Sequence, residues 1–240
     1  MTFNDEKQAI RERVWALLDH EGVVPPDVRG RIPNFQGADR AADLLASTEV
    51  WRDARTVKAN PDWPQLPVRA RALSEGKRVY MAVPRMAAEK PFFLLDPHTL
   101  DLSSEAAADP RTAADHAQRA AIEDMQSVDV VVCGCVAVNQ SGARLGKGAG
   151  YSDLEVALLI EAGLVTDATV IVTTVHDLQV IDDDIPEAPY DFRVDVIATP
   201  SRLIRCGNPR RPAGIIQNNL RRDQIEAIPA LSRRFKEQRT

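Results

Sequence analysis

The sequence predicts a three-layer α/β/α fold in which helices cover both faces of a mostly parallel sheet. Short apolar runs rich in β-branched residues alternate along the chain with segments whose apolar residues recur every three to four positions. The strongest run, residues 128–139, is apolar almost throughout, which is typical of a strand buried on both faces. This alternation favours parallel strands joined by crossover helices.

The N-terminal half begins with a predicted amphipathic helix. Residues 4–19 place Ile10, Val14, Leu17 and Leu18 on one face of that helix. Proline and glycine then mark where the following elements end. These elements are expected to be a helix over 38–50, a strand over 54–59, a helix over 69–75 closed by Gly76, and a strand over 78–83 stopped by Pro84.

The C-terminal half contains the strongest strand signal. Residues 104–126 are expected to mix helix and loop, because Pro110 interrupts an alanine-rich pattern. The further expected elements are the strand over 128–139, a helix over 152–162, and strands over 168–174 and 194–199. The glycine-rich loop after residue 139 would lie at the C-terminal end of a central strand, where parallel sheets usually bind ligands.

Length and charge indicate one domain with an extension. The 240 residues are 44% hydrophobic, enough for a buried core. We expect an α/β domain over residues 1–205 and a peripheral basic extension over 206–240. The net charge is −5, yet residues 201–240 carry ten Lys and Arg against three acids. A nucleic-acid contact and a solvated tail both explain this charge, but no aromatic residues alternate with the cations, so nucleic acid is disfavoured.

Several protein classes are not supported. Three cysteines give no disulfide framework, Met1 is followed by a charged segment, and no apolar run suits a membrane helix. We therefore expect a cytoplasmic protein without a membrane partner. Cys133 and Cys135 share one strand face, but no other cysteine or clustered histidine would complete a metal site.

The segment over residues 142–155, GARLGKGAGYSDLE, predicts a site for a polyphosphate. Its alternating glycines and its cations are Gly146, Gly148, Gly150, Arg144 and Lys147. Glycine lets the backbone approach an anion closely, and a following helix directs its first amides at that anion. Asp153 could hold Mg²⁺. The pattern is neither GxxxxGK[ST] nor GxGxxG, and a glycine-rich turn without a ligand is the alternative.

With these segments placed, the chain resembles the 5-formyltetrahydrofolate cyclo-ligase family, also called methenyltetrahydrofolate synthetase. The resemblance spans roughly residues 5–205, and the family loop RLGxGxGYYD appears here as RLGKGAGYSD. The other segments that carry it are residues 7–15, 76–86, 128–141 and 188–205. Residues 30–38 and 57–69 look most like the divergent branch of methenyltetrahydrofolate synthetase domain-containing proteins.

The resemblance implies a CoA-transferase-like fold and an ATP- and Mg²⁺-dependent reaction. 5-Formyltetrahydrofolate would become 5,10-methenyltetrahydrofolate with release of ADP and phosphate, through transfer of the γ-phosphate to the formyl oxygen. Such chemistry mainly needs positioned charge. Two alternatives stay open: an ATP-binding paralogue acting on another pterin or in thiamin-related metabolism, and a non-enzymatic module associated with nucleotides or RNA.

The resemblance also implies roles for individual residues. ATP would contact Lys7, Arg11, Arg144, Leu145, Gly146, Lys147, Gly148, Ala149, Gly150 and Tyr151. Arg144 and Lys147 would be the catalytic cations, and Asp153 and Asp191 would hold Mg²⁺. The reduced folate would contact Tyr151, Gln65 and Arg85. Ser152 replaces a tyrosine of the family loop, and Gln65 or Asp62 would replace a family carboxylate near the folate.

Simpler interpretations exist for several of these residues. Without the resemblance, Lys7 and Arg11 read as solvated cations on a helix surface, and Asp191 as a strand terminator. His176 and Asp177 could form a general acid/base pair. Neighbouring side chains in a strand point to opposite faces, however, which favours a structural histidine.

Overall fold

The large sheet of the computed structural model has parallel strands at its centre and antiparallel strands at its edges. The structure describes residues 2–237; Met1 and residues 238–240, which end the predicted extension, lie outside the described residues. The strand order is β11-β10-β8-β5-β1-β2-β3-β4, and β10, β8, β5, β1 and β2 are parallel. The strands are β1 Thr56–Ala59, β2 Arg78–Ala82, β3 Phe92–Leu95, β4 Gln118–Ala120, β5 Val130–Cys133, β8 Val170–Thr174, β10 Val196–Ala198 and β11 Leu203–Arg205.

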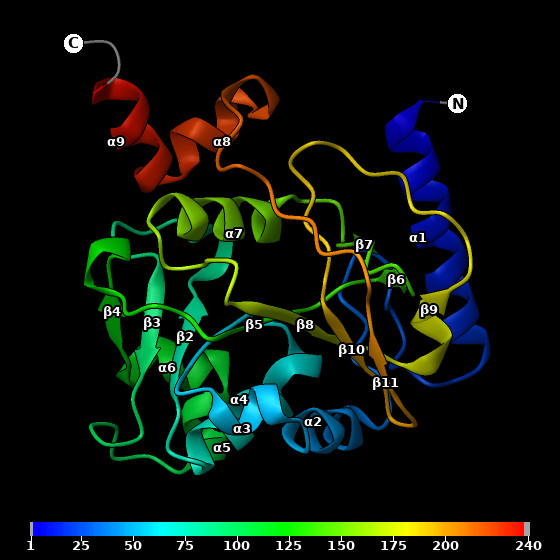
Figure 1. Ribbon diagram of the computed structural model, residues 1–240, viewed down its shortest axis with the longest axis horizontal. Helices are drawn as coiled ribbons and strands as arrows, with labels where there is room; N and C mark the ends of the chain where they lie inside the picture. Colours follow the sequence, from blue (N-terminus) through cyan, green and yellow to red (C-terminus); the bar gives the residue numbers. More distant parts are fainter. Residues whose placement is uncertain (1, 238–240) are drawn as a thin grey trace.

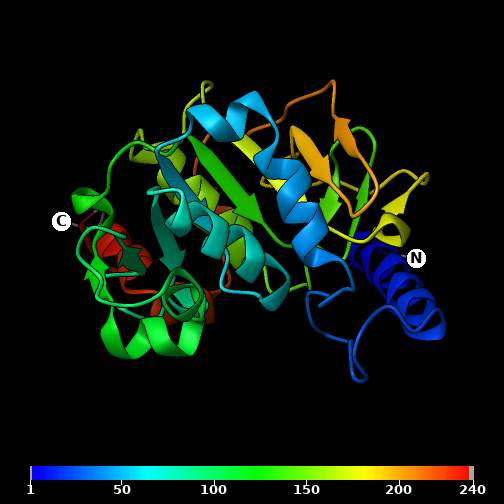
Figure 2. The same cartoon turned by 90° about the horizontal axis from the view of Figure 1, so that it is seen from below.

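Helices cover both faces of this sheet, which confirms the predicted three-layer fold (Figure 1). One face carries α2 Ala38–Ala46, α3 Glu49–Asp53, α4 Leu66–Ser74, α5 Ser104–Ala108 and α6 Pro110–His116, and the other carries α7 Tyr151–Glu161. Strand β5 supplies both cores: Val130 and Val132 pack on the α4 side, and Val131 and Cys133 on the α7 side. Figure 2 shows α2, α3 and α4 lying across the sheet.

A second, smaller sheet lies beside the large one at the end of the molecule that carries α1 (Figures 1 and 2). It consists of β7 Arg144–Leu145, β6 Ala137–Asn139 and β9 Val180–Ile181. Helix α1, Phe3–His20, packs in the same core through Val14, Trp15 and Leu18, which are at most 2% exposed.

The single strand predicted over 128–139 is wrong, because the chain changes sheets within it. Strand β5 ends at Cys133, and β6 begins at Ala137 in the smaller sheet. Gly134 stands at the change of direction, where a Cβ atom would lie only 2.7 Å from Gln65 Oε1. The glycine therefore permits a close passage that any other side chain would obstruct.

Other predicted boundaries also shift. The helix expected over 38–50 is two helices, because Thr48 caps α3 by accepting a hydrogen bond from Trp51 N. Helix α4 begins at Leu66 rather than residue 69, and the antiparallel strands β3 and β4 were not predicted. Pro110 does interrupt the alanine-rich region, as the first residue of α6. The short 3-10 helices are η1 Trp63–Gln65, η2 Pro84–Met86, η3 Ile122–Asp124, η4 Asp177–Gln179 and η5 Gln217–Asn219.

The described C-terminal segment packs on the outer side of α7 (Figure 1). It contains α8 Arg222–Ala227 and α9 Pro229–Glu237. Ile228 and Leu231 are fully buried against Leu154, Leu158 and Met86. A domain boundary at residue 205 stays a prediction. Among the described residues, no helix combines the length and the apolar character needed to cross a membrane.

Candidate functional site

The glycine-rich loop connects β7 to the N-terminus of α7. Gly148 has φ +100° and Gly150 has φ +75°, a left-handed conformation that other residues adopt only with strain. Gly150 is the N-cap of α7, and none of the described side chains caps this terminus. The first amides of α7 are therefore available to an anion, with the positive end of the helix dipole behind them.

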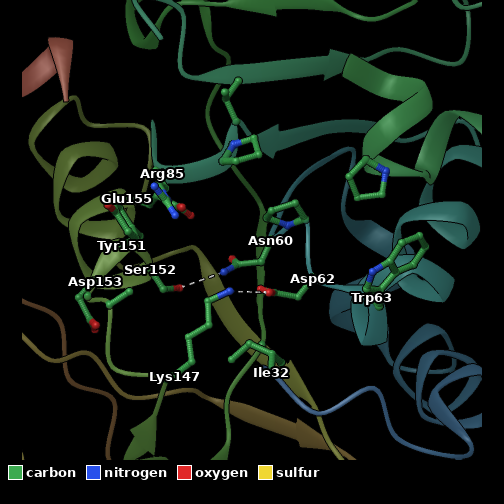
Figure 3. Close-up of a pocket in the computed structure, with 18 of the residues that line it drawn as sticks. Ile32, Asn60, Asp62, Trp63, Arg85, Lys147, Tyr151, Ser152, Asp153 and Glu155 are labelled. Carbon is green, nitrogen blue, oxygen red and sulfur yellow. Dashed lines mark hydrogen bonds and ion pairs between the residues drawn. The ribbon is translucent and has the colours of Figure 1, made fainter. Parts of the chain in front are cut away.

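The loop separates two cavities. The first, which we call the α1-side cavity, has a volume of about 700 Å³ and lies between the loop, α1 and the C-terminal segment. The second, the strand-side cavity, has a volume of about 620 Å³ and lies where β1, β2 and β5 end (Figure 3). The residues that line both cavities are Arg144, Gly146, Lys147, Ala149, Gly150 and Asp153. The loop is thus a wall that both cavities share, which we call the common wall. It lies at the C-terminal ends of the parallel strands, as the sequence predicted.

Lys7 and Arg11 are buried in the wall of the α1-side cavity and are not solvated surface cations. Their exposed fractions are 7% and 9%. Lys7 Nζ donates to Asp191 Oδ2 at 2.5 Å, and Arg11 Nε donates to the carbonyl oxygen of Gly146 at 2.7 Å. Burial lowers the pKa of Arg11, although the carboxylates of Asp191 and Asp153 oppose this shift. One turn of α1 therefore joins the loop to the Asp191 segment.

Arg144 is the cation at the centre of the common wall. Its side chain is 3% exposed, and its Nη2 donates to Asp153 Oδ1 at 2.5 Å. Its guanidinium carbon lies 3.7 Å from the centre of the Phe192 ring. Burial raises the pKa of the Asp153 carboxyl, and the Arg144 guanidinium opposes that shift. Arg144 Nε is buried and has no hydrogen-bond partner within residues 2–237, so the wall holds an unused donor suited to an anion.

The two predicted metal ligands each face a cation. Asp153 pairs with Arg144, and Asp191 pairs with Lys7. Within residues 2–237, no group of three or more His, Cys, Asp and Glu could hold a metal ion by itself. Mg²⁺ bound together with a nucleotide needs only one or two protein carboxylates, because phosphates and water supply its other ligands. The donor set therefore fits a magnesium–nucleotide complex better than a free ion.

A buried polar network forms the floor of the strand-side cavity. Lys58 is 0% exposed, forms an ion pair with Glu155 and donates to Asn60 Oδ1 at 2.8 Å. Asn60 Nδ2 in turn donates to Ser152 Oγ at 3.3 Å. Figure 3 shows this bond beside the ion pair from Lys147 Nζ to Asp62 Oδ1, which spans 3.1 Å. The network fixes neutral hydrogen-bonding groups on the cavity wall.

An exposed aromatic ring and two arginines flank the same cavity. Trp63 is 45% exposed, and the guanidinium of Arg111 lies 5.7 Å from the centre of its ring. Arg85 lies across the cavity from Trp63 (Figure 3), in a left-handed conformation with φ 60°. An open tryptophan face beside cations is suited to a flat ligand that carries negative charge.

Among the residues predicted for the site, only Gln65 lines neither cavity. Gln65 is fully buried, and its Nε2 donates to Thr174 Oγ1 at 3.1 Å. Its Oε1 has no hydrogen-bond partner in the part of the chain that the structure describes. The sequence analysis missed Lys58, Asn60, Trp63, Arg111 and Glu155. A lysine inside an apolar strand was the available signal, because buried lysines are rare unless they are paired.

The other candidate chemical groups have structural partners. His176 Nδ1 accepts a hydrogen bond from Leu178 N at 3.3 Å, and Asp177 accepts one from Thr199 Oγ1 at 2.7 Å. Neither residue lines a described cavity beside the loop. Cys135 Sγ lies 3.3 Å from Thr173 Oγ1 in the core. The geometry agrees with the structural interpretation of His176.

Comparisons with known proteins point to one family. The family model described as the 5-formyltetrahydrofolate cyclo-ligase family matches residues 4–200. The methenyltetrahydrofolate synthase domain-containing protein of Bos taurus is 37% identical over 233 residues, which cover 94% of this chain and 60% of that protein. The chain thus spans about three fifths of the length of this relative.

Two further proteins are similar to the chain. A 5-formyltetrahydrofolate cyclo-ligase of Mycolicibacterium smegmatis is 34% identical over 82 residues, covering 34% of this chain and 39% of that protein. The solution structure of Aquifex aeolicus 5,10-methenyltetrahydrofolate synthetase matches with a TM-score of 0.52 and 18% identity, covering 89% of this chain and 97% of that one. At this identity the second match supports the fold alone.

Proposed function

The chain belongs to the 5-formyltetrahydrofolate cyclo-ligase family, and we propose that it converts 5-formyltetrahydrofolate to 5,10-methenyltetrahydrofolate with Mg²⁺ and ATP. ADP and phosphate would be released, and the phosphate would carry away the formyl oxygen. One observation carries this proposal: two cavities of substrate size share a wall that holds a buried arginine with an unused donor. A reaction that transfers a phosphoryl group from one substrate to another needs two adjoining sites of this kind.

The nucleotide would occupy the α1-side cavity. Lys7, Arg11 and Arg144 supply its cations, and the loop amides supply neutral donors. Leu145, Gly146, Gly148, Ala149 and Gly150 would line the phosphates. Asp153 and Asp191 would hold Mg²⁺, which supplies charge neutralisation at the phosphates when bound.

The reduced folate would occupy the strand-side cavity. Trp63 and Tyr151 offer aromatic faces to its ring system, and Asn60 and Ser152 offer neutral hydrogen-bonding groups. Arg85 and Arg111 would bind the carboxylates of its glutamyl end. Gln65 lies behind Gly134 and would act by holding the cavity wall in place. A direct contact between Gln65 and the folate stays a prediction.

The proposed chemistry depends on the cations of the common wall. Arg144 and Lys147 line both cavities, so they stand where a phosphoryl group would meet the formyl oxygen. Fixed cations there would stabilise charge that develops on the phosphoryl oxygens, and such a contact contributes about 3–4 kcal/mol to a transition state. The loop would also hold the two substrates close together and in the orientation that the transfer needs.

The test is the absorbance of 5,10-methenyltetrahydrofolate when the protein is mixed with 5-formyltetrahydrofolate, Mg²⁺ and ATP. We expect a rise that needs ATP and that is strongly reduced in Lys147→Ala. The proposal would be overturned by the absence of any rise from protein that is folded and binds ATP, which would favour the paralogue acting on another pterin.

A further inference from the structure

We infer that the C-terminal segment over residues 214–224 forms the wall of the α1-side cavity that holds the base of the nucleotide. This inference rests on the proposed function, since it takes the ligand of that cavity to be a nucleoside triphosphate. The segment lies outside the family match, which ends at residue 200. Neither the glycine loop nor the resemblance assigns it a role.

The α1-side cavity changes character from one end to the other. Its buried cations lie at the loop and at α1, and they are Lys7, Arg11 and Arg144. The C-terminal segment also contributes a cation, Arg221, but its side chain is 60% exposed and pairs with Asp223. Most of its apolar residues belong to α7 and to the C-terminal segment, namely Leu154, Ala157, Ile215, Ile216 and Leu220, whereas only Leu145 and Ala149 lie at the loop. A nucleoside triphosphate has the same gradient, from a polyanionic end to a flat and largely apolar base. The phosphates fit the loop end, and the base then falls between α7 and the C-terminal segment.

The C-terminal segment is fixed in position before any ligand binds. Ile215 N donates to Glu161 Oε1 at 2.8 Å, and a Cβ atom on Gly214 would lie 2.6 Å from the same side chain. Gly214 thus allows the segment to approach α7 closely. Upstream, Arg211 forms an ion pair with Asp195 and donates to Arg193 O at 2.8 Å.

Downstream, the burial of Ile228 and Leu231 anchors α8 and α9 to α7. Gln224 of α8 is 7% exposed and lines the cavity. Its Oε1 accepts a hydrogen bond from Arg221 N at 3.1 Å, and its Nε2 lies 3.7 Å from the position of a Cβ on Gly150. This places an amide donor next to the phosphate end of the cavity. Because this wall is held at both ends, it loses little conformational entropy when a ligand binds.

The test compares the binding of Mg·ATP with that of magnesium tripolyphosphate, which has the phosphates but no base. The variants Ile216→Ser and Leu220→Ser each remove an apolar contact from the wall. Gln217→Ser is the matched control, because Gln217 is exposed, lies next to Ile216 and does not line the cavity. Calorimetry on the 240-residue chain gives both affinities, and thermal unfolding reports the folded state of each variant.

We expect the unchanged protein to bind ATP more tightly than tripolyphosphate. Each wall variant should lose about tenfold in ATP affinity, as expected for one apolar side chain, and keep its affinity for tripolyphosphate. The control should match the unchanged protein for both ligands. Lys7→Ala should weaken both ligands, because it acts on the phosphates.

The other outcomes separate this inference from the proposed function. Unchanged ATP affinity in both wall variants would overturn the inference and leave the proposed function standing. An equal loss for ATP and tripolyphosphate would also overturn it, because the segment would then act only through the fold. Failure of the unchanged protein to bind either ligand would overturn the proposed function itself, and the inference with it.

Discussion

The two cavities beside the glycine loop present different kinds of polar groups. The α1-side cavity presents full charges that are already paired, Lys7 with Asp191 and Arg144 with Asp153. The strand-side cavity also has charged residues, Arg85 and Arg111 among them, but it adds the neutral groups of Asn60 and Ser152 and the exposed ring of Trp63. Its ion pairs are Lys58–Glu155 in the floor, Lys147–Asp62 on the wall, and the Arg144–Asp153 pair that it shares with the α1-side cavity.

This difference supports the proposed placement of the two ligands. Buried cations that are held by carboxylates can be taken over by a polyanion, which brings its own negative charge and its own metal ion. Neutral donors and an open aromatic face suit a heteroaromatic ring instead. The loop thus divides a region suited to phosphates from a region suited to a pterin, and each prediction below tests that division.

The largest effect is expected at Arg144, the buried cation that serves both cavities. Arg144→Ala leaves the carboxylate of Asp153 without its partner, so the free energy of unfolding should fall by roughly 3–5 kcal/mol. Cyclisation should be lost as well. Urea denaturation measures the stability, and the absorbance of the methenyl product measures the activity.

The double variant Arg144→Ala, Asp153→Asn separates these two effects. It removes both charges, so most of the lost stability should return, while the activity should not. A double variant with full activity would contradict the roles proposed for Arg144 and Asp153.

The next largest effect is expected at Lys147, whose side chain is 43% exposed and pairs with Asp62. Lys147→Ala should lower kcat/KM for ATP by about 100-fold, because the variant removes a charge that the proposed function assigns to the phosphates. Its stability should change by less than about 1 kcal/mol, since the ion pair is exposed. Lys90→Ala, at an exposed lysine away from both cavities, is the matched control. Equal losses in the two variants would show that net charge alone matters.

A smaller effect is expected on the strand side. Ser152→Ala removes the acceptor of Asn60 Nδ2, so it should cost about 1 kcal/mol of stability. The KM for 5-formyltetrahydrofolate should rise by a few fold, and the KM for ATP should not change. Steady-state kinetics with each substrate varied in turn measures both. A rise in the KM for ATP alone would show that Ser152 acts on the nucleotide, which would contradict the division between the two cavities.

The smallest effect is expected at Arg13, two residues from Arg11 on α1. Its side chain is 55% exposed, and its ion pair with Asp183 lies in solvent. Arg13→Ala should therefore leave the stability within about 0.5 kcal/mol and both KM values unchanged. Kinetics of Arg13→Ala beside Arg11→Ala checks whether position on the helix, rather than charge, decides nucleotide binding. Equal effects of the two variants would show that position on the helix does not decide nucleotide binding.

The α1-side cavity could be predicted largely from local patterns. The loop is continuous in sequence, and its positive φ angles fall on Gly148 and Gly150. Lys7 and Arg11 are one helical turn apart, so the helical pattern already places them on the same edge. The burial of these two cations could not be read from the sequence, because it depends on the contact of α1 with the smaller sheet.

The strand-side cavity could not be predicted from the residues alone. Asn60 and Trp63 follow β1, whereas Arg111 and Ser152 come from two other segments, and the three segments meet because β5, β1 and β2 are neighbours in the sheet. The same limit applies at Gly134, since an apolar run does not reveal that the chain passes from one sheet to another. Strand order is a property of the whole fold, and no local pattern encodes it.

The most direct test of the division is a comparison of Arg11→Ala with Trp63→Ala in steady-state kinetics with both substrates. Arg11 lines only the α1-side cavity, and Trp63 lines only the strand-side cavity. We expect Arg11→Ala to raise the KM for ATP about tenfold and to leave the KM for 5-formyltetrahydrofolate unchanged, and Trp63→Ala to do the reverse. If both variants raise the KM of the same substrate, the two cavities do not hold different ligands, and the account is contradicted.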